Sequence, residues 1–590
     1  MEPPSCDLER RQRFRGGLVL GCVLLVFLGL AYRVAYVSTV LAPDLTRLAD
    51  DQQRGHQTIP ARRGLVFDSR GRIVAGSKPV YSVCGDPVLI HAALEESGQT
   101  LPDLARQLAT ILRMDAGFIE DRIRTHANRR FCWFKRRVPD VEADAIRDAA
   151  LPGVGLRQEM SRTYPMGSRM AHVIGLVGVD GDGLEGIEQS FDAHLRGRPG
   201  RAVAFYDARR RPIAGVREGS EPPIDGGHVV LTLDAVIQEA AEDQLAHQIR
   251  QHNAESGVAL VMDPRTGDIL AMACWPTYDP NDPSSSSPET RRNRIITDPI
   301  EPGSTFKPFV AASALKLGVI NRTEIINCGN GTMTVNGRVL TDTHPSGPCT
   351  LMDIIVHSSN IGMGQLGLRL GNERLVEIVS AFGFGRPTGI EIAGEAPGSI
   401  PSPATWSRLT STSVPMGYEI AVTPLQLATG YCALVNGGLL LKPRLVRAVL
   451  DPGGEVIESY DKPVVVQRVL PEDIARYMQE TVLVAVVKRG GTDGRRDKLD
   501  MYEYQMLGKT GTSKLAYRNR PGYESGAYLS SFVGAAPAEE PRAVALVMIR
   551  RPKGSGYYGR IVAAPAVKEI LFSTLSYLGV PGRGTIQAGL

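Results

Sequence analysis

Apolar residues lie along this chain in runs of different length and spacing, and each kind of run predicts a different element. The longest uncharged run, residues 16–32, is followed by Arg33 and a further apolar stretch to about residue 40. It is about long enough to cross a bilayer as a helix, with Arg33 reaching toward the interface near its far end. Because no second run of comparable length occurs in the sequence, we expect a single N-terminal transmembrane helix.

Shorter patterns predict the elements of the remaining chain. Helical spacing of apolar residues predicts helices over residues 101–114, 236–254 and 563–579. Apolar runs joined by turn-forming residues predict antiparallel hairpins over residues 62–75, 255–275 and 528–550. In the C-terminal part the strands lie near both sequence ends and helices fill the interval. This order predicts an α+β fold with an antiparallel sheet flanked by helices.

These patterns divide the chain into five segments. The predicted segments are a cytoplasmic tail (1–15), a transmembrane anchor (16–40), an elongated mixed α/β pedestal (41–234), a C-terminal domain (235–580) and a C-terminal tail (581–590). Residues 41–234 show no clustered nucleophile and base, so we expect the chemistry in the C-terminal domain.

Charge and composition narrow the class of protein. The chain has 43% hydrophobic and 22% charged residues, which is typical of a globular protein, and a net charge of +4 is too small to indicate nucleic-acid binding. Four arginines between residues 10 and 15 precede the apolar run, which predicts a cytoplasmic N-terminus and an extracytoplasmic remainder. A cleaved signal peptide is the alternative, but the run is long for one and no convincing cleavage site follows directly.

The cysteines indicate no metal site. The chain has eight cysteines without CxxC or zinc-ligand spacing. Cys328 and Cys349 flank a turn-rich segment. They form either a disulfide, if that compartment is oxidising, or two small buried thiols.

The segment EPGSTFKPF, residues 301–309, holds the first candidate for catalysis. Ser304 and Lys307 are three residues apart, so they share one face of the helix that the following residues predict. Pro308 is tolerated only near a helix start, which places Ser304 where backbone amides favour developing negative charge. A serine becomes a useful nucleophile when a base takes its proton, and a lysine with a lowered pKa can be that base. A helix cap beside a solvated lysine is the alternative.

Two further motifs favour the catalytic interpretation. Ser358-Ser359-Asn360 lies between two apolar helical runs, and Lys509-Thr510-Gly511-Thr512 lies in a predicted strand before the last hairpin. The order S-x-x-K, S-x-N, K-T-G is the pattern of penicillin-binding proteins and serine β-lactamases. Each motif alone has an ordinary structural reading, but the three in this order are specific.

With these motifs the chain resembles a class B penicillin-binding protein, a membrane-anchored peptidoglycan D,D-transpeptidase. The resemblance covers nearly the whole chain, in segments of the pedestal (62–75, 162–175, 183–197) and of the C-terminal domain (262–282, 301–309, 422–438, 530–549). The middle Ser359, Lys514 and residues 416–428 are similar to the division-specific FtsI type. The elongation subgroup, whose middle motif more often ends in Asp, remains the alternative.

The resemblance implies a role for each catalytic residue. Ser304 would attack the carbonyl between the last two D-alanines of a stem peptide, and Lys307 would take its proton. Ser358 would relay a proton to the leaving amine, and Asn360 would hold Lys307 and the substrate amide. Lys509 would supply positive charge that lowers the pKa of Lys307.

The resemblance also implies the substrate contacts. Thr510 and Thr512 would bind the terminal carboxylate, and Gly511 would leave room for substrate beside the strand. The backbone amides of Ser304 and Thr512 would form the oxyanion hole. No metal or cofactor is expected.

Other functions share parts of this pattern. A β-lactamase would deacylate fast and needs no pedestal or anchor, and a D,D-carboxypeptidase would use water as acceptor. A bifunctional glycosyltransferase would need paired carboxylates that the pedestal lacks, and a non-catalytic β-lactam-binding division scaffold would not need the three motifs. The implied partners are stem peptides, β-lactams, an FtsW-type multi-span glycosyltransferase and other divisome proteins at the inner membrane.

Overall fold

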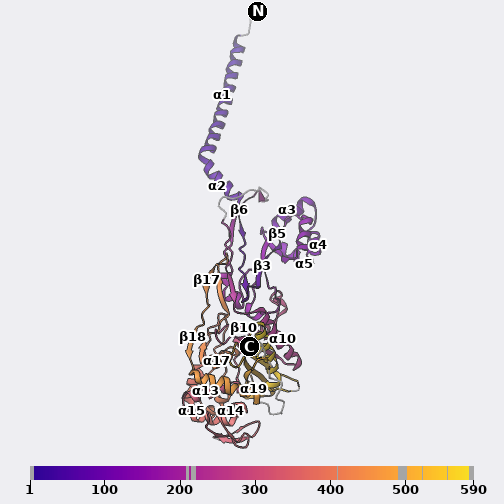
Figure 1. Cartoon of the computed structure of the whole chain (residues 1–590). Helices are drawn as coiled ribbons and strands as arrows, with labels where there is room; N and C mark the ends of the chain where they lie inside the picture. Colours follow the sequence, from indigo (N-terminus) through magenta and orange to yellow (C-terminus); the bar gives the residue numbers. More distant parts are fainter. Residues whose placement is uncertain are drawn as a thin grey trace, which may run out of the picture. The chain divides into compact units, whose positions relative to one another are not determined.

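Figure 1 presents the computed structural model of the chain. It describes residues 6–206, 212–213, 221–335, 337–407, 409–489, 501, 503–517, 519–520, 522–554 and 556–583. The chain divides into two compact units: residues 1–61 with 198–224, and residues 62–197 with 225–590. Residues 1–5 of the predicted N-terminal tail and 584–590 of the predicted C-terminal tail lie outside the described residues.

The first unit contains the predicted transmembrane helix. α1 (Cys6–Tyr36) continues through the π-helical segment η1 (Val37–Leu41) into α2 (Ala42–Gln53). Within it, the stretch Arg10–Arg47 is long and apolar enough to cross a membrane. A small antiparallel sheet of β1 (Arg54–Ile59), β6 (Gly200–Tyr206) and β7 (Pro212–Ile213) completes this unit.

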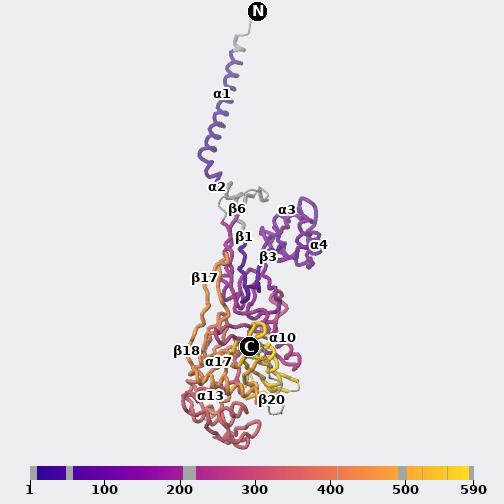
Figure 2. The backbone as a smooth tube through the Cα atoms, in the orientation of Figure 1, coloured from indigo at the N-terminus to yellow at the C-terminus, as the bar shows by residue number. Residues whose placement is uncertain are grey.

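The second unit contains a seven-stranded sheet that joins distant parts of the sequence. Its main path runs β17 (Val456–Ser459), β16 (Val446–Leu450), β8 (His228–Leu231), β2 (Val66–Phe67), β3 (Ile73–Gly85) and β4 (Cys132–Val138), and β5 (Val154–Thr163) also pairs with β3. The β2–β3 pair confirms the predicted hairpin over residues 62–75. In Figure 2 the orange chain of β17 runs beside the purple strands of this sheet. Residues from the predicted C-terminal domain therefore extend a sheet of the predicted pedestal.

One end of this sheet carries a separate small core. The helices α3 (Pro87–Ser97), α4 (Leu101–Leu112), α5 (Ala116–Thr125) and α6 (Asp140–Ala149) pack against β3 and β4 around fully buried leucines and isoleucines. α4 confirms the predicted amphipathic helix, and its inward face includes Leu104, Leu108 and Leu112.

The C-terminal part is built on a five-stranded antiparallel sheet. Its order is β10 (Ile269–Trp275), β9 (Ser256–Met262), β21 (Ala543–Arg550), β20 (Tyr523–Ala536) and β19 (Leu507–Ala516). β9 with β10 and β20 with β21 confirm the two predicted hairpins. α10 (Ala235–Gln251) and α21 (Ala564–Tyr577), both predicted, cover one face of the sheet.

The opposite face of the sheet packs against the main hydrophobic core, which contains α13 (Lys307–Lys316), α14 (Leu351–Val356), α15 (Asn360–Ala381) and α17 (Pro424–Val435). Shorter elements complete the unit: α7 (Ala171–Ile174), α8 (Gly186–Ser190), α9 (Asp192–Leu195), η2 (Pro283–Ser285), α11 (Pro288–Arg291), α12 (Arg294–Thr297), η3 (Gly303–Phe306), β11 (Ile326–Asn327), β12 (Thr332–Val335), β13 (Arg338–Thr341), β14 (Pro348–Cys349), η4 (Pro403–Thr405), α16 (Thr410–Ser413), η5 (Val414–Met416), β15 (Leu439–Leu441), β18 (Val465–Arg468), α18 (Glu472–Tyr477), η6 (Met478–Leu483), α19 (Val484–Arg489) and α20 (Gly559–Val562). The predicted α+β class is confirmed.

Candidate active site

Ser304 lies in a tight turn that leads into α13. The turn is the 3₁₀ segment η3, and Lys307 is the first residue of the α-helix that follows. Gly303 has φ +56°, which favours glycine, and its N–H donates to the carbonyl of Gly417 (3.0 Å). The hydroxyl of Tyr431 donates to the carbonyl of Thr305 (2.7 Å). These bonds fix the turn and leave Ser304 half-buried.

Lys307 is fully buried and points at the second motif. Its Nζ donates to the carbonyl of Ser358 (2.5 Å), to the hydroxyl of Ser358 (3.2 Å) and to Oδ1 of Asn360 (2.8 Å). Burial first, and then the charge of Lys509, hold the pKa of Lys307 well below its ordinary value, while Asp342 opposes them. A lysine in this environment can be neutral and act as a base.

Ser358 occupies the predicted turn between α14 and α15. α14 ends at Val356, two residues before Ser358. Ser359 caps α15, because its hydroxyl accepts from the N–H of Gly362 (2.9 Å). Ser358 itself has φ +56°, a conformation that residues other than glycine seldom adopt. The turn thereby points both the carbonyl and the hydroxyl of Ser358 at Lys307.

Lys509 reaches the same hydroxyl from β19. Its Nζ donates to Oγ of Ser358 (3.1 Å) and to the carbonyl of Thr510 (3.1 Å). Its side chain is fully buried, and burial lowers its pKa to about 7. Ser358 therefore accepts hydrogen bonds from two lysines, which leaves its own proton available to a third group.

The remaining residues of the third motif divide between two faces of the strand. Side chains alternate along a strand, so Lys509 and Gly511 face the turn of Ser304, while Thr510 and Thr512 lie on the other face. Oγ1 of Thr512 accepts from the N–H of Gly559, the first residue of α20 (3.1 Å).

Gly511 lies directly against other parts of the protein. A Cβ there would lie 2.4 Å from Oγ of Ser531 and 2.8 Å from Cγ2 of Thr305. The glycine therefore allows β19 to pack closely on the Ser304 turn. This packing brings Lys509 to Ser358.

Asp342 is a residue of the site that the sequence did not predict. Its carboxylate accepts from the hydroxyl of Ser359 (2.5 Å), from the N–H of Asn360 and from the N–H of Ile361 (3.1 Å). It lies just after β13, far enough from Ser359 in the sequence that no short motif includes both. An acidic residue in a loop carries no signal of such a contact by itself.

Cys328 and Cys349 are present as two buried free thiols. β11 pairs with β14, which places Ile326 opposite Cys349, and the N–H of Cys328 donates to the carbonyl of Gly347 (2.7 Å). The thiol of Cys349 donates to the carbonyl of Ser346 (3.4 Å), and burial first, then Cys328, raises the pKa of Cys349 to about 12. In the described part of the chain, no three His, Cys, Asp or Glu side chains gather closely enough to hold a metal ion.

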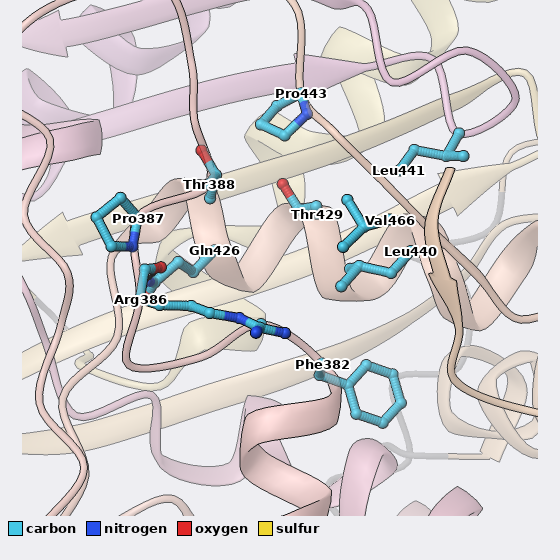
Figure 3. Close-up of a pocket in the computed structure, with 11 residues that line it drawn as sticks. Phe382, Arg386, Pro387, Thr388, Gln426, Thr429, Leu440, Leu441, Pro443 and Val466 are labelled. Carbon is cyan, nitrogen blue, oxygen red and sulfur yellow. Dashed lines mark hydrogen bonds between the residues drawn. The ribbon is translucent and has the colours of Figure 1, made fainter. Parts of the chain in front are cut away.

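A separate hollow lies between α17 and the strands β15 and β18. It has a cavity volume of about 50 Å³ beside Phe382, Arg386, Thr429, Leu440 and Val466. Figure 3 shows these side chains around the hollow, with Arg386 lying across it. None of its lining residues belongs to the three motifs, so it is distinct from the candidate active site.

Comparison with known proteins assigns the family. Residues 257–572 match the penicillin binding protein transpeptidase domain, and residues 58–231 match the penicillin-binding protein dimerisation domain. The peptidoglycan D,D-transpeptidase FtsI of Escherichia coli K12 is 34% identical over 572 residues, 96% of this chain and 92% of its own length. Stage V sporulation protein D of Bacillus subtilis is 30% identical over 581 residues, 97% of this chain and 87% of its own length.

Solved structures agree with these relatives. Penicillin binding protein 3 of Mycobacterium tuberculosis, complexed with aztreonam, is 25% identical with a TM-score of 0.68, over 89% of this chain and 98% of that one. The fold and the lysine–serine–lysine arrangement define a serine penicillin-binding enzyme. More particularly, the chain belongs to the penicillin-binding protein transpeptidases of class B, as the dimerisation and transpeptidase domains in this order indicate.

Proposed function

We propose that this chain cross-links peptidoglycan stem peptides ending in D-Ala-D-Ala, with Ser304 as the nucleophile and Lys307 as its base. The single observation that carries the residue roles is the set of hydrogen bonds joining Lys307, Ser358, Asn360 and Lys509 one turn from Ser304. The relatives named peptidoglycan D,D-transpeptidase support the substrate class.

Acylation uses the lowered pKa of Lys307. Neutral Lys307 takes the proton of Ser304 while Oγ attacks the carbonyl carbon between the two D-alanines. The carbon–nitrogen bond then breaks, and Ser358 gives its proton to the leaving amine and regains one from a lysine that donates to it. D-Alanine leaves, and the peptide remains as an ester on Ser304.

The negative charge of the tetrahedral intermediate needs fixed donors. The backbone amides of Ser304 and Thr512 are the proposed oxyanion hole, and one such donor is typically worth about 3 kcal/mol of transition-state stabilisation. Thr510 and Thr512, on the face of β19 opposite Lys509, are the proposed contacts of the substrate's terminal carboxylate along this edge strand of the sheet. The hydroxyl oxygen of Thr512 already accepts from the N–H of Gly559, so binding of the terminal carboxylate would use the hydroxyl proton as a donor.

Deacylation completes the cross-link. An amine from a neighbouring stem peptide attacks the ester carbonyl and loses its proton to the lysine pair, and Ser304 regains its own proton. The product is a peptide bond between two stem peptides. A β-lactam would follow the acylation step and stay on Ser304, because its amine leaving group remains tied to the acyl group after the ring opens and keeps the acceptor out.

The proposed setting is the cell membrane. The N-terminus lies in the cytoplasm, the helix over residues 16–40 crosses the membrane, and the pedestal (41–234) and transpeptidase domain (235–580) lie outside; the arginines before the helix support this orientation. An FtsW-type glycosyltransferase of the division machinery is the proposed partner. Pull-down of that partner with the chain, with and without residues 16–75, tests this contact, and equal recovery would contradict it.

The division role is proposed from the similarity to FtsI. A fluorescent fusion expressed from its own promoter should gather at midcell. A uniform signal along the lateral wall would favour the elongation subgroup instead.

Intact-protein mass spectrometry tests the central proposal. The full chain in detergent and its Ser304→Ala variant are exposed to a penicillin and followed for several hours. We expect a penicilloyl adduct on the wild type that persists for hours and is absent from the variant. An adduct lost within seconds would indicate a β-lactamase, and a folded protein without any adduct would indicate a non-catalytic scaffold.

A further inference from the structure

A loop outside the three motifs reaches the catalytic turn. After β13, the N–H of Asp342 donates to the carbonyl of Gly331 (3.0 Å), which anchors the loop to its own hairpin. The carboxylate then spans the first turn of α15: Oδ2 accepts from Ser359, and Oδ1 accepts from the N–H groups of Asn360 and Ile361.

We propose that Asp342 is a positioning residue for acylation, because its carboxylate holds Ser358 and Asn360 in the geometry that contacts Lys307. Asp342 is not expected to touch substrate; it acts through the turn that carries the second motif. The proposal rests on the proposed roles of Ser304 and Lys307.

The turn needs such a support because Ser358 has an unfavourable backbone conformation. A non-glycine residue with φ +56° persists only when its surroundings hold it there. On one side, the N–H groups of Ser358 and Ser359 donate to carbonyls of α14 (3.2 and 2.9 Å). On the other side, Asp342 holds the first residues of α15. Without the carboxylate, the backbone N–H groups of Asn360 and Ile361 would lose the acceptor that holds them on this side of the turn.

The hairpin that carries Asp342 is itself rigidly placed. Leu340 of β13 is buried, and a Cβ on Gly364 of α15 would lie 2.6 Å from its Cδ1, so the hairpin packs directly on the helix. Nδ2 of Asn360 also donates to the carbonyl of Thr341 (2.9 Å). One end of the Asn360 amide therefore contacts the hairpin while the other accepts from Lys307.

Besides holding the turn, the carboxylate of Asp342 acts on the pKa of Lys307, and this second effect can be measured separately. The charged groups that act on Lys307 are Lys509, from β19, which lowers its pKa, and Asp342, which raises it. Loss of the Asp342 charge should therefore lower the pKa of Lys307 further. Acylation requires neutral Lys307, so the acidic limb of the acylation rate would move to lower pH.

Two substitutions of Asp342 separate the effect of its hydrogen bonds from the effect of its negative charge. In Asp342→Asn, the amide oxygen still accepts from the two backbone N–H groups but the charge is gone. In Asp342→Ala, both are gone. Asp353→Asn is the matched control, because Asp353 caps the neighbouring α14 through Thr350 and contacts none of the three motifs.

The experiment measures the second-order rate of penicillin acylation on the full chain in detergent, from pH 5 to pH 10, beside thermal melting. We expect Asp342→Ala to acylate about 10- to 100-fold more slowly at every pH. Asp342→Asn should keep most of the rate at its optimum and move the acidic limb to lower pH. Asp353→Asn should change melting without moving the limb.

An Asp342→Ala protein that acylates at the wild-type rate would overturn the proposal. If that variant fails to fold, Asp342→Asn decides: an unchanged acidic limb together with an unchanged rate would also overturn it. Failure of the proposed function gives a different result, because the wild type itself would then form no adduct on Ser304.

Discussion

At the scale of single residues, the two buried lysines are the unusual feature of this molecule. Burying an ammonium group is unfavourable, and here Lys307 and Lys509 both donate to one hydroxyl, that of Ser358. The two cations also repel each other, so the neutral form of Lys307 is favoured. The arrangement is unfavourable for stability, but it keeps the proposed base, Lys307, and the proposed proton donor, Ser358, in one hydrogen-bonded network.

Loss of Lys307 should remove acylation without unfolding the protein. In Lys307→Ala the base for Ser304 is missing, and we expect the rate of penicillin acylation to fall by about 10²–10⁴-fold. Lys316→Ala is the control, because Lys316 lies on the same helix but donates to the carbonyl of Val469. Stopped-flow mixing with a fluorescent penicillin measures both. Equal rates in the two variants would exclude Lys307 as the base.

Loss of Lys509 should move the pH dependence in the direction opposite to Asp342→Asn. The Lys509 charge lowers the pKa of Lys307, so Lys509→Ala raises that pKa and the acidic limb of acylation moves to higher pH. The rate should also fall at all pH values, since Ser358 loses a donor. Acylation rates measured from pH 5 to pH 10 check the shift. A limb that moves to lower pH would contradict the assigned electrostatics.

At the scale of elements, close backbone contacts decide where the nucleophile lies. Gly417 follows η5 with φ +80°, and a Cβ there would lie 2.1 Å from the carbonyl oxygen of Gly303. That oxygen belongs to the turn of Ser304, and the carbonyl of Gly417 accepts from the N–H of the same glycine. The backbone of Gly303 or Gly417 therefore cannot shift to make room for a side chain without also moving Ser304.

Gly417→Ala should therefore lower both stability and acylation. Gly454→Ala is the matched control: Gly454 has φ +90° but no atom within 4 Å of its Cβ position. We expect the control to lose about 1–2 kcal/mol from backbone strain alone. The Gly417 variant should lose more, and its acylation should slow because the turn shifts. Denaturant melts and acylation rates check both, and equal behaviour of the two variants would refute the contact.

The sequence predicted the local elements of the site well. The Ser304 turn, the turn at Ser358 and the strand of Lys509 all follow from patterns within about ten residues. Strand alternation also implies that Thr510 and Thr512 do not share a face with Lys509. The contacts of Gly511 could not be predicted, because they depend on how the strand packs against a turn about 200 residues earlier.

Contacts between distant segments were beyond the sequence patterns. Asp342 carries no motif, and its role depends on how the β12–β13 hairpin packs on α15. Likewise nothing in the sequence of residues 446–459 indicates that β16 and β17 extend the sheet of β2 and β3. Pairing of strands this far apart in sequence depends on the whole fold.

At the scale of the whole molecule, a buried charge cluster joins three separate segments of the second unit. Glu188 of α8 is completely buried and accepts from Nε of Arg63 (2.6 Å), which precedes β2, and from Nε of Arg162 (2.6 Å) on β5. Arg162 also donates to the carbonyl of Gly64 (2.6 Å). The carboxylate thereby ties the start of the seven-stranded sheet to β5 and to α8.

Glu188→Ala should destabilise the chain while leaving the chemistry intact. Removing the carboxylate takes its partner from the Nε group of each nearly buried guanidinium, although Arg63 keeps its ion pair with Asp192 (2.7 Å). Breaking a buried pair typically costs about 3–5 kcal/mol. The control is Glu472→Gln, which breaks the exposed pair with Arg476 (2.7 Å), where about 0–1 kcal/mol is typical. None of the residues of the three motifs contacts this cluster, so penicillin acylation below the melting temperature should stay within about threefold of wild type. Thermal melting and penicillin acylation of both variants test this prediction. Equal melting temperatures of the two variants would show that the cluster does not stabilise the fold. A large loss of acylation in folded Glu188→Ala would show that the sheet and the active site are coupled.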